Sequence, residues 1–374
     1  MPEGDTIHRT AAALRAAMLG KPMTAFQATR LSGLRPTPGA VIERVEATGK
    51  HLEIGWDDGV VLHTHMRMTG SWHLYRTGER WRKSTKQMRV VIEVPGWQAV
   101  CFAAPVVETY RAKAMSRHPG LGSLGPDLAR PGVDIEACVE RMARFSDADT
   151  TVGDVLLDQR VACGVGNVFK SETLWACEVS PFTLVAALPV ELRFQILQQA
   201  ATLLQANVER AHRETVSGSP EGLAVYGRFG KPCLRCSTPI EVRRHGEQAR
   251  VTYWCPGCQP LLEPPAAVPD DPQAPPRPRR RGLFGRRHQH DAGAATDGGV
   301  RPAEPLDAAD EMTPVADPDT VPTPLDERTD EPAPFQQAPI AFDRHPAAQR
   351  FLANRPNRLE PEYVDPLLAR QAGA

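Results

Sequence analysis

The sequence predicts an α+β multidomain protein, and three stretches of different character support this fold class. Residues 1–130 combine a helical period with short β-like runs, residues 131–222 are patterned as helices, and residues 223–259 carry two close pairs of cysteines. Residues 260–374 form a fourth, Pro-rich stretch. A chain of 374 residues is long enough for two or three folded domains.

The first stretch is predicted to be an antiparallel β-sandwich with one helix packed alongside. Apolar residues spaced by three and four open the chain, as on one face of a helix: Ile7, Ala11, Leu14 and Met18. Turn residues such as Asp57, Asp58 and Gly59 then separate five runs of β character. These runs cover residues 53–56, 60–63, 70–75, 89–94 and 99–102. Short strands joined by tight turns favour an antiparallel arrangement.

The second stretch is predicted to be helical from about residue 132 to residue 212. Helical segments are expected at 151–157, 168–177 and 189–212, with a Gly-rich turn at 163–167 between the first two. The last segment has an amphipathic series typical of a helix that covers a core: Leu192, Ile196, Ala200, Leu203 and Leu204.

The third stretch is predicted to bind one structural Zn²⁺. Cys233 and Cys236 form one pair, Cys255 and Cys258 form the other, and 18 residues separate the pairs. Four thiolates in two knuckle turns suit a closed tetrahedral zinc site. Neither pair begins a helix in a βαβ setting, which argues against a redox role. The intervening hairpin carries basic residues, so contact with nucleic acid and stapling of the fold both stay open: Arg243, Arg244 and Arg250.

Charge divides the chain into a mildly basic body and an acidic tail. Residues 1–258 carry 31 Lys and Arg against 26 Asp and Glu, whereas residues 259–374 carry 13 Arg, no Lys and 19 acidic residues. Of the 36 prolines, 21 lie in residues 260–374, which predicts a disordered tail. This tail either recruits a protein partner, with the basic island 277–287 adding contact with phosphates, or serves as a solvating linker. The basic surplus by itself is weak evidence for nucleic acid.

No stretch reaches the roughly 18 apolar residues that span a membrane. Acidic residues stand at the N-terminus where a secretory signal would carry basic ones. We therefore expect a cytoplasmic protein with reduced thiols, in which Cys101, Cys138, Cys163 and Cys177 are small buried side chains.

Several short motifs, taken together and in order, resemble one known family. They are Pro2-Glu3-Gly4, Thr48-Gly49-Lys50, His65-Met66-Arg67-Met68-Thr69-Gly70, Leu156-Leu157-Asp158-Gln159, Gly164-Val165-Gly166-Asn167 and Tyr226-Gly227-Arg228 before the cysteines. Over residues 2–259 the sequence is similar to the formamidopyrimidine-DNA glycosylase/endonuclease VIII family. The resemblance implies a catalytic β-sandwich domain (1–130), a helix–two-turn–helix DNA-binding domain (131–222) and a zinc finger (223–259), in a monomer of the bacterial cytosol or nucleoid that binds damaged DNA.

The resemblance also implies a covalent mechanism. After removal of Met1, the secondary amine of Pro2 would attack the sugar C1′ of a damaged nucleotide, and β-elimination would cleave the strand. A free α-amine has a pKa near 7.7–8, so part of it is unprotonated at neutral pH. Glu3 would carry protons to and from the sugar ring oxygen, and Lys50 would contact phosphate and assist departure of the base.

Three further residues are implied to hold the DNA. Asn167 and Arg250 would bind phosphates that flank the lesion. Met68 would fill the space left by the flipped nucleotide, unless it is a core residue of the β domain.

The sequence departs from the oxidised-purine branch of the family, whose Asp-Pro-Arg-Arg-Phe-Gly loop is absent: residues 104–110 read Ala-Pro-Val-Val-Glu-Thr-Tyr. This absence favours the endonuclease VIII branch and oxidised pyrimidines. Activity on oxidised purines and a catalytically silent DNA-binding role are the alternatives. A second acid of the family is replaced by Thr6, with Asp5 beside it.

Overall fold

The computed structural model describes residues 2–113, 120–146, 149–217, 219, 221–246 and 249–263. The predicted disordered tail, its basic island and its partner-binding role lie outside these residues, except for the first few positions after Gln259. Among the described residues, no helix has the length and apolar character needed to cross a membrane.

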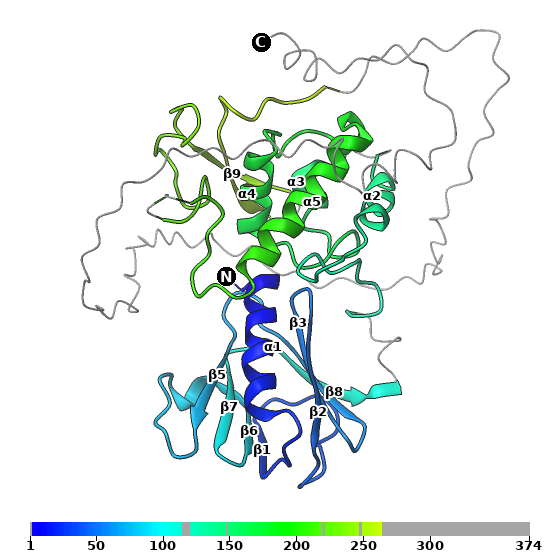
Figure 1. The fold of residues 1–374 in the computed structure, drawn as a ribbon, viewed down its shortest axis with the longest axis vertical. Coiled ribbons are helices and arrows are strands. Elements are labelled where there is room, and N and C mark those ends of the chain that lie inside the picture. Colours follow the sequence, from blue (N-terminus) through cyan, green and yellow to red (C-terminus); the bar gives the residue numbers. More distant parts are fainter. Residues whose placement is uncertain are drawn as a thin grey trace, which may run out of the picture. The chain divides into compact units, whose positions relative to one another are not determined.

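Two four-stranded antiparallel sheets form the predicted β-sandwich (Figure 1). One sheet has the order β1-β6-β7-β5 and the other has the order β2-β3-β4-β8. The strands of the first sheet are β1 (Ala25–Ala28), β6 (Met88–Val94), β7 (Trp97–Phe102) and β5 (Ser71–Arg76). The strands of the second are β2 (Ile42–Thr48), β3 (His51–Trp56), β4 (Val60–His65) and β8 (Val106–Arg111). A short 3₁₀ turn, η1 (Thr85–Gln87), precedes β6.

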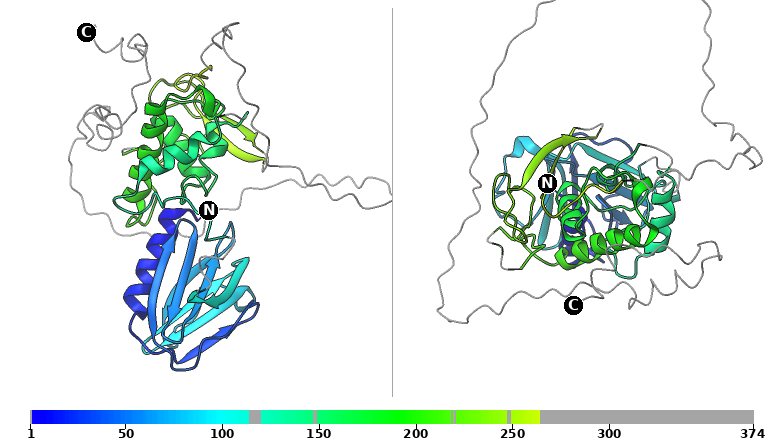
Figure 2. Two further views of the ribbon diagram at one scale, coloured as in Figure 1. Left: turned by 90° about the vertical axis from the view of Figure 1, so that its right-hand side faces the viewer. Right: turned by 90° about the horizontal axis from the view of Figure 1, so that it is seen from above.

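Helix α1 (Gly4–Met18) lies along one side of the sandwich, as predicted (Figure 2). The four apolar residues that predicted this helix are all buried in one core with residues from both sheets. These helical and strand side chains share a single apolar interior, whose burial is the main force that holds helix and sheets together.

All five predicted strands are confirmed, while β1, β2 and β8 were missed. Strand β2 has the sequence IERVEAT, and β8 has VVETYR. Charged residues interrupt the apolar run in each, because one face of this sheet carries polar side chains. Glu53, His63 and Glu108 stand opposite one another across β3, β4 and β8 on that face.

The helical region contains α2 (Ile135–Ala143), α3 (Val152–Val155), α4 (Asn167–Ala176) and α5 (Val190–Asn207), with a 3₁₀ turn, η3 (Val185–Ala187), before α5. The predicted helix 168–177 is confirmed as α4. The segment predicted at 151–157 is only one turn of helix. The segment predicted at 189–212 ends at Asn207, whose side chain donates to Leu203 O and accepts from the backbone N–H of Glu214.

Two short strands connect the cysteine pairs, as predicted. Strands β9 (Glu241–His245) and β10 (Arg250–Trp254) are antiparallel, and Arg250 stands directly opposite His245. The chain beyond Cys258 continues against the helical region, since Ser180 N donates to Pro260 O and Leu262 N donates to Thr183 Oγ1. Leu262 also packs on the helical core.

Candidate active site and metal centre

The Glu3 carboxylate is buried at the first turn of α4. Its Oε2 accepts hydrogen bonds from the backbone N–H groups of Gly166 at 2.8 Å and Phe169 at 3.2 Å, and its Oε1 accepts from Val168 at 2.8 Å. These N–H groups have no partner within the helix, so a carboxylate there satisfies them and meets the positive end of the helix dipole. A side chain at position 166 would clash with this carboxylate, because a Cβ there would lie 2.3 Å from Glu3 Cδ.

This contact fixes the N-terminal segment on the helical region. The backbone N–H of Gly4 also donates to Gly164 O at 2.9 Å. Pro2 is half-buried and directly precedes Glu3, so the nitrogen of Pro2 is one residue from an anchored carboxylate. Met1 lies outside the described residues.

Lys50 lies in the tight turn that joins β2 to β3. Gly49 adopts φ +56°, its N–H donates to Asp127 Oδ2 at 2.8 Å, and a Cβ on it would lie 2.8 Å from Cys163 Sγ. Only glycine meets both demands without strain. Burial is the main cause that lowers the pKa of Lys50; the Glu3 carboxylate partly opposes this shift, and Arg250 adds to it. The structure therefore brings three of the predicted site residues into one electrostatic neighbourhood.

Asp127 links three segments of the chain, and no sequence motif pointed to this role. Its buried carboxylate accepts from Gly49 N, from Ala129 N at 3.0 Å, and pairs with His8 Nε2 at 2.8 Å. One side chain thus joins α1, the Lys50 turn and the start of the helical region. No local motif distinguishes it from a surface aspartate.

Helix α4 and strand β10 bring Asn167 and Arg250 together. The Asn167 side-chain amide donates to Val251 O, the neighbour of Arg250, and Asn167 is 4% exposed. One turn along the helix, Lys170 Nζ donates to Thr252 Oγ1 at 2.7 Å. Burial lowers the pKa of Lys170 to about 8, although Asp154 and Glu3 favour its charged form. Lys170 is a second buried amine near the candidate active site, and no sequence motif pointed to it.

Met68 is 66% exposed, whereas Met66, two residues earlier, is 2% exposed. The alternative that Met68 is a core residue is therefore wrong. Arg67 between them adopts φ +46°, which turns the chain outward at the connection from β4 to β5. His65 ends β4, and burial followed by the charge of Lys50 lowers the pKa of His65 to about 4. The imidazole of His65 is therefore neutral at physiological pH.

Asp5 and Glu172 have structural partners instead of facing solvent. Asp5 is fully buried and forms two 2.8 Å hydrogen bonds with the guanidinium of Arg213. Glu172 on α4 accepts from the backbone N–H groups of Ala224, Val225 and Tyr226. Both carboxylates hold the 213–226 segment against α1 and α4. No sequence motif pointed to Arg213 as the partner of Asp5.

The four predicted metal ligands form one cluster. Their sulfur atoms all lie within 4.8 Å of one another, with Cys233 Sγ at 3.8 Å from Cys258 Sγ and Cys236 Sγ at 3.5 Å from Cys255 Sγ. Sulfurs at about 2.3 Å from a tetrahedral ion are about 3.8 Å apart. The donor set and its spacing therefore fit a single metal ion that prefers thiolates.

Neighbouring groups also support negatively charged sulfur. Trp175 Nε1 and the backbone N–H of Arg235 donate to Cys233 Sγ at 3.3 and 3.4 Å. The Arg235 guanidinium lies over the Trp175 ring at 4.2 Å. Gln259 accepts from Cys255 N and donates to Val179 O, which ties the second knuckle to the helical region.

Two family models match the chain. The formamidopyrimidine-DNA glycosylase N-terminal domain matches residues 1–105, and the H2TH domain of formamidopyrimidine-DNA glycosylase matches residues 124–218. The chain is 37% identical over 264 residues to the probable endonuclease 8 2 of Streptomyces coelicolor, and the aligned region covers 69% of this chain and 94% of that relative. It is also 37% identical over 264 residues to the DNA-(apurinic or apyrimidinic site) lyase Nei2 of Mycolicibacterium smegmatis, covering 69% and 99%.

The fold agrees with solved structures. The formamidopyrimidine-DNA glycosylase of Lactococcus lactis, bound non-covalently to DNA with an abasic site, matches with a TM-score of 0.60 and 20% identity, covering 69% of this chain and all of that chain. A sandwich joined to a helix–two-turn–helix region and a four-cysteine hairpin defines a class of DNA repair enzymes. The chain belongs to the formamidopyrimidine-DNA glycosylase/endonuclease VIII family of DNA glycosylases and AP lyases.

Proposed function

We propose that this protein is a bifunctional DNA glycosylase/AP lyase of base excision repair that removes oxidised pyrimidines, with Pro2 as its nucleophile after removal of Met1. The observation that carries the proposal is the anchoring of Glu3, the residue next to Pro2, on the first turn of α4. That turn carries Asn167, so it relates the amine to a residue expected to hold the DNA strand. The relatives named endonuclease 8 support the same branch.

The chemistry follows from a secondary amine. The nitrogen lone pair of Pro2 forms a bond to C1′, and the glycosidic bond breaks, so that the base leaves with the electron pair and takes up a proton. The nitrogen then loses its proton, the ring oxygen takes one up, and the C1′–O4′ bond breaks, which leaves an iminium at C1′. This iminium acidifies the C2′ proton. Loss of this proton and cleavage of the C3′–O bond release the 3′ phosphate and leave a conjugated iminium. In a second elimination, loss of the C4′ proton and cleavage of the C5′–O bond release the 5′ phosphate. Water then hydrolyses the iminium, which frees the Pro2 amine and releases the sugar fragment.

Glu3 and Lys50 are proposed to serve this reaction as the resemblance implies. Glu3 would exchange a proton with the sugar ring oxygen, and Lys50 would contact phosphate and assist departure of the base. The lowered pKa of Lys50 brings its amine closer to neutrality than an ordinary lysine. Asn167 and Arg250 would bind the flanking phosphates, and the exposed Met68 would fill the gap left by the flipped nucleotide.

The metal is proposed to be one structural Zn²⁺ held by Cys233, Cys236, Cys255 and Cys258. All four ligands come from the protein, so the ion would keep the β9–β10 hairpin and Arg250 in place. We further propose domain limits of 1–130, 131–222 and 223–259, a cytoplasmic monomer, and a tail at 260–374 that either recruits a protein or acts as a linker.

Oxidised purines are the second candidate substrate class. The absence of the Asp-Pro-Arg-Arg-Phe-Gly loop from residues 104–110 favours pyrimidines. Paired assays on duplexes with thymine glycol and with 8-oxoguanine decide between them: preferential excision of 8-oxoguanine would overturn the substrate assignment.

Borohydride trapping tests the mechanism. With abasic-site DNA, the mature protein is expected to give a covalent adduct, because borohydride reduces the iminium. Pro2→Gly is expected to change or abolish the adduct. A wild-type protein that binds abasic DNA without an adduct would instead be a catalytically silent binder, and a retained Met1 in the active protein would exclude Pro2.

A further inference from the structure

A groove of about 660 Å³ lies at the end of the β1-β6-β7-β5 sheet. Its walls come from the ends of several strands. Thr29 N, after β1, donates to Arg89 O at 3.0 Å, and Ala103 N, after β7, donates to Gln87 O at 2.7 Å. Three basic residues line it: Arg30, Lys83 and Arg89. None of the described residues that line it is acidic.

The loop beside this groove is the most basic part of the sandwich. Residues 76–89 carry six Lys and Arg against one Glu. This local surplus of basic residues attracts a polyanion.

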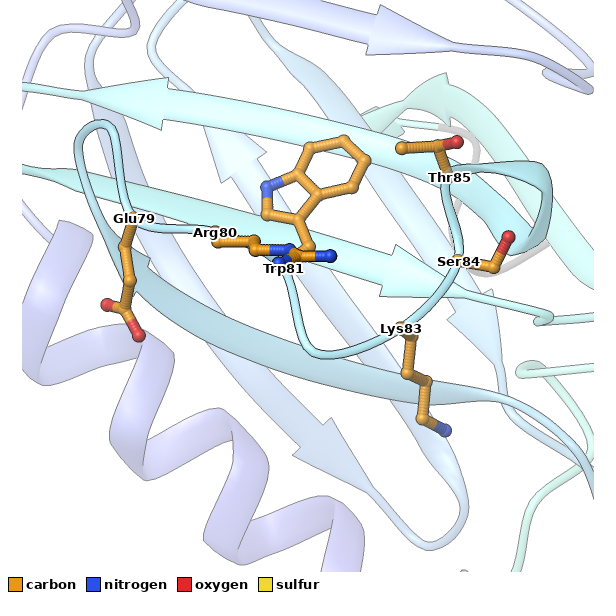
Figure 3. A pocket seen from close by; sticks show the side chains of 6 residues that line it. All are labelled: Glu79, Arg80, Trp81, Lys83, Ser84 and Thr85. Atoms are coloured by element: carbon orange, nitrogen blue, oxygen red, sulfur yellow. The ribbon is translucent and has the colours of Figure 1, made fainter.

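Lys83 is held in place at the edge of the groove. Its Nζ donates to Ser71 Oγ at 3.0 Å. An ammonium group has three donors, so this bond leaves capacity for a phosphate oxygen. Lys83 also lines a second hollow with Glu79, Arg80 and Trp81, and Figure 3 shows the Trp81 indole and the Lys83 side chain leaving the loop in opposite directions.

The Met68 turn separates this groove from the Lys50 site. Lys50 lies in the turn between β2 and β3, whereas the basic residues of the groove lie beside β1, β5 and β6 of the other sheet; Val107 of β8 is the lining residue from the Lys50 sheet. Residues 66–70 cross between them, and Thr69 both lines the groove and donates to Ala103 O at 3.0 Å. A side chain that fills the space of an extruded nucleotide faces the orphaned base of the other strand. A surface beyond that filler therefore meets the undamaged strand.

We propose that the groove lined by Arg30, Lys83 and Arg89, with the adjoining basic loop 76–89, binds phosphates of the DNA strand opposite the lesion. This proposal rests on the proposed function, which places the damaged strand at Lys50, Asn167 and Arg250. The groove would hold the partner strand while the damaged nucleotide is rotated out, and it would make binding to duplex DNA stronger than binding through one strand alone.

The test uses the full-length mature protein and a duplex with a tetrahydrofuran abasic analogue. In one probe, neutral methylphosphonates replace the phosphates that flank the opposite base on the undamaged strand; in a second probe, they replace flanking phosphates of the damaged strand. The wild type is expected to lose about tenfold in affinity on the first probe. The variant Arg30→Gln/Lys83→Gln is expected to bind the unmodified duplex about tenfold more weakly than the wild type does, and the slope of its log affinity against log salt concentration is expected to be lower by roughly two. On the first probe, the affinity of this variant is expected to fall by less than about twofold relative to its own affinity for the unmodified duplex.

Lys21→Gln/Arg111→Gln is the matched control, because both residues lie at the strand ends opposite to Lys50. It is expected to behave as the wild type. A groove variant that binds the duplex as tightly as the control, or that becomes insensitive to the second probe instead of the first, would overturn the proposal. Borohydride trapping is measured separately at saturating abasic duplex: loss of the adduct in the wild type refutes the proposed function, whereas the methylphosphonate comparison tests the groove.

Discussion

Asp5 and Arg213 form a two-point ion pair between the first turn of α1 and the segment after α5. Both hydrogen bonds are 2.8 Å, and Arg213 also donates to Thr6 Oγ1 at 3.0 Å. The Asp5 side chain is fully buried and that of Arg213 is 17% exposed. The pair therefore ties the N-terminal end of α1 to the segment after α5, and loss of Arg213 would leave the Asp5 charge buried without this partner.

Arg213→Ala is expected to destabilise the protein by roughly 3–5 kcal/mol, because it leaves the Asp5 charge buried without its partner. Arg210→Ala is the control: Arg210 pairs with Glu214 but is 46% exposed, and exposed pairs contribute about 0–1 kcal/mol. Denaturant unfolding of both variants checks the difference. Equal destabilisation would show that the Asp5 pair is not specially placed.

Gly166→Ala is expected to reduce adduct formation strongly, since the new Cβ would lie 2.3 Å from Glu3 Cδ and would displace the carboxylate from α4. Gly55→Ala is a suitable control, because a Cβ there meets nothing closer than 3.4 Å. The measurement is the rate of borohydride trapping on abasic DNA. An unchanged rate in the Gly166 variant would mean that the hydrogen bonds between Glu3 and α4 do not position the nucleophile.

Lys170 is expected to make stability rise with pH. Its pKa in the folded protein, about 8, lies below its ordinary value of 10.5, so between these values the unfolded chain binds more protons than the folded one. The free energy of unfolding therefore increases with pH across this window, by up to about 1.4 kcal/mol per pH unit. Urea unfolding of the wild type and Lys170→Met from pH 7 to 10.5 isolates the effect, and parallel curves would contradict it.

Removal of the metal is expected to loosen the β9–β10 hairpin and weaken DNA binding through Arg250. One zinc ion per chain should be released by a strong chelator or by mercurial modification of the thiols, and Cys236→Ala should fail to retain it. Metal analysis and DNA binding are measured on the same samples. Full binding by metal-free protein would show that the cluster does not support the hairpin.

Truncation after Glu263 is expected to leave lyase activity on short duplexes unchanged, because it keeps the contact of Leu262 with Thr183. Truncation after Gln259 removes that contact and is expected to lower thermal stability. A large loss of activity in the longer truncated protein would assign the tail a direct part in the reaction.

Local patterns predicted much of the fold and the metal cluster, because both depend on residues close in sequence. Helix α1 follows from four apolar residues, and the metal site follows from two Cys-x2-Cys pairs. Strands β2 and β8 were missed because their sheet carries polar side chains on one face, which interrupts the apolar pattern. The partnerships of Asp127, Lys170 and Asp5 were not predictable, since each joins residues from separate elements and neither partner has a local signal.

The binding of the Glu3 carboxylate at the start of α4 also has a consequence for protein synthesis. The groups that hold it, Gly166, Val168 and Phe169, are translated more than 160 residues after it. While the chain is still growing, its first residues lack this binding surface and stay accessible, so the proposed removal of Met1 would take place at that stage. The reactive amine would therefore be produced early on the ribosome and become competent only when most of the enzyme has emerged, so incomplete chains released early would carry a free proline end but no organised site around it.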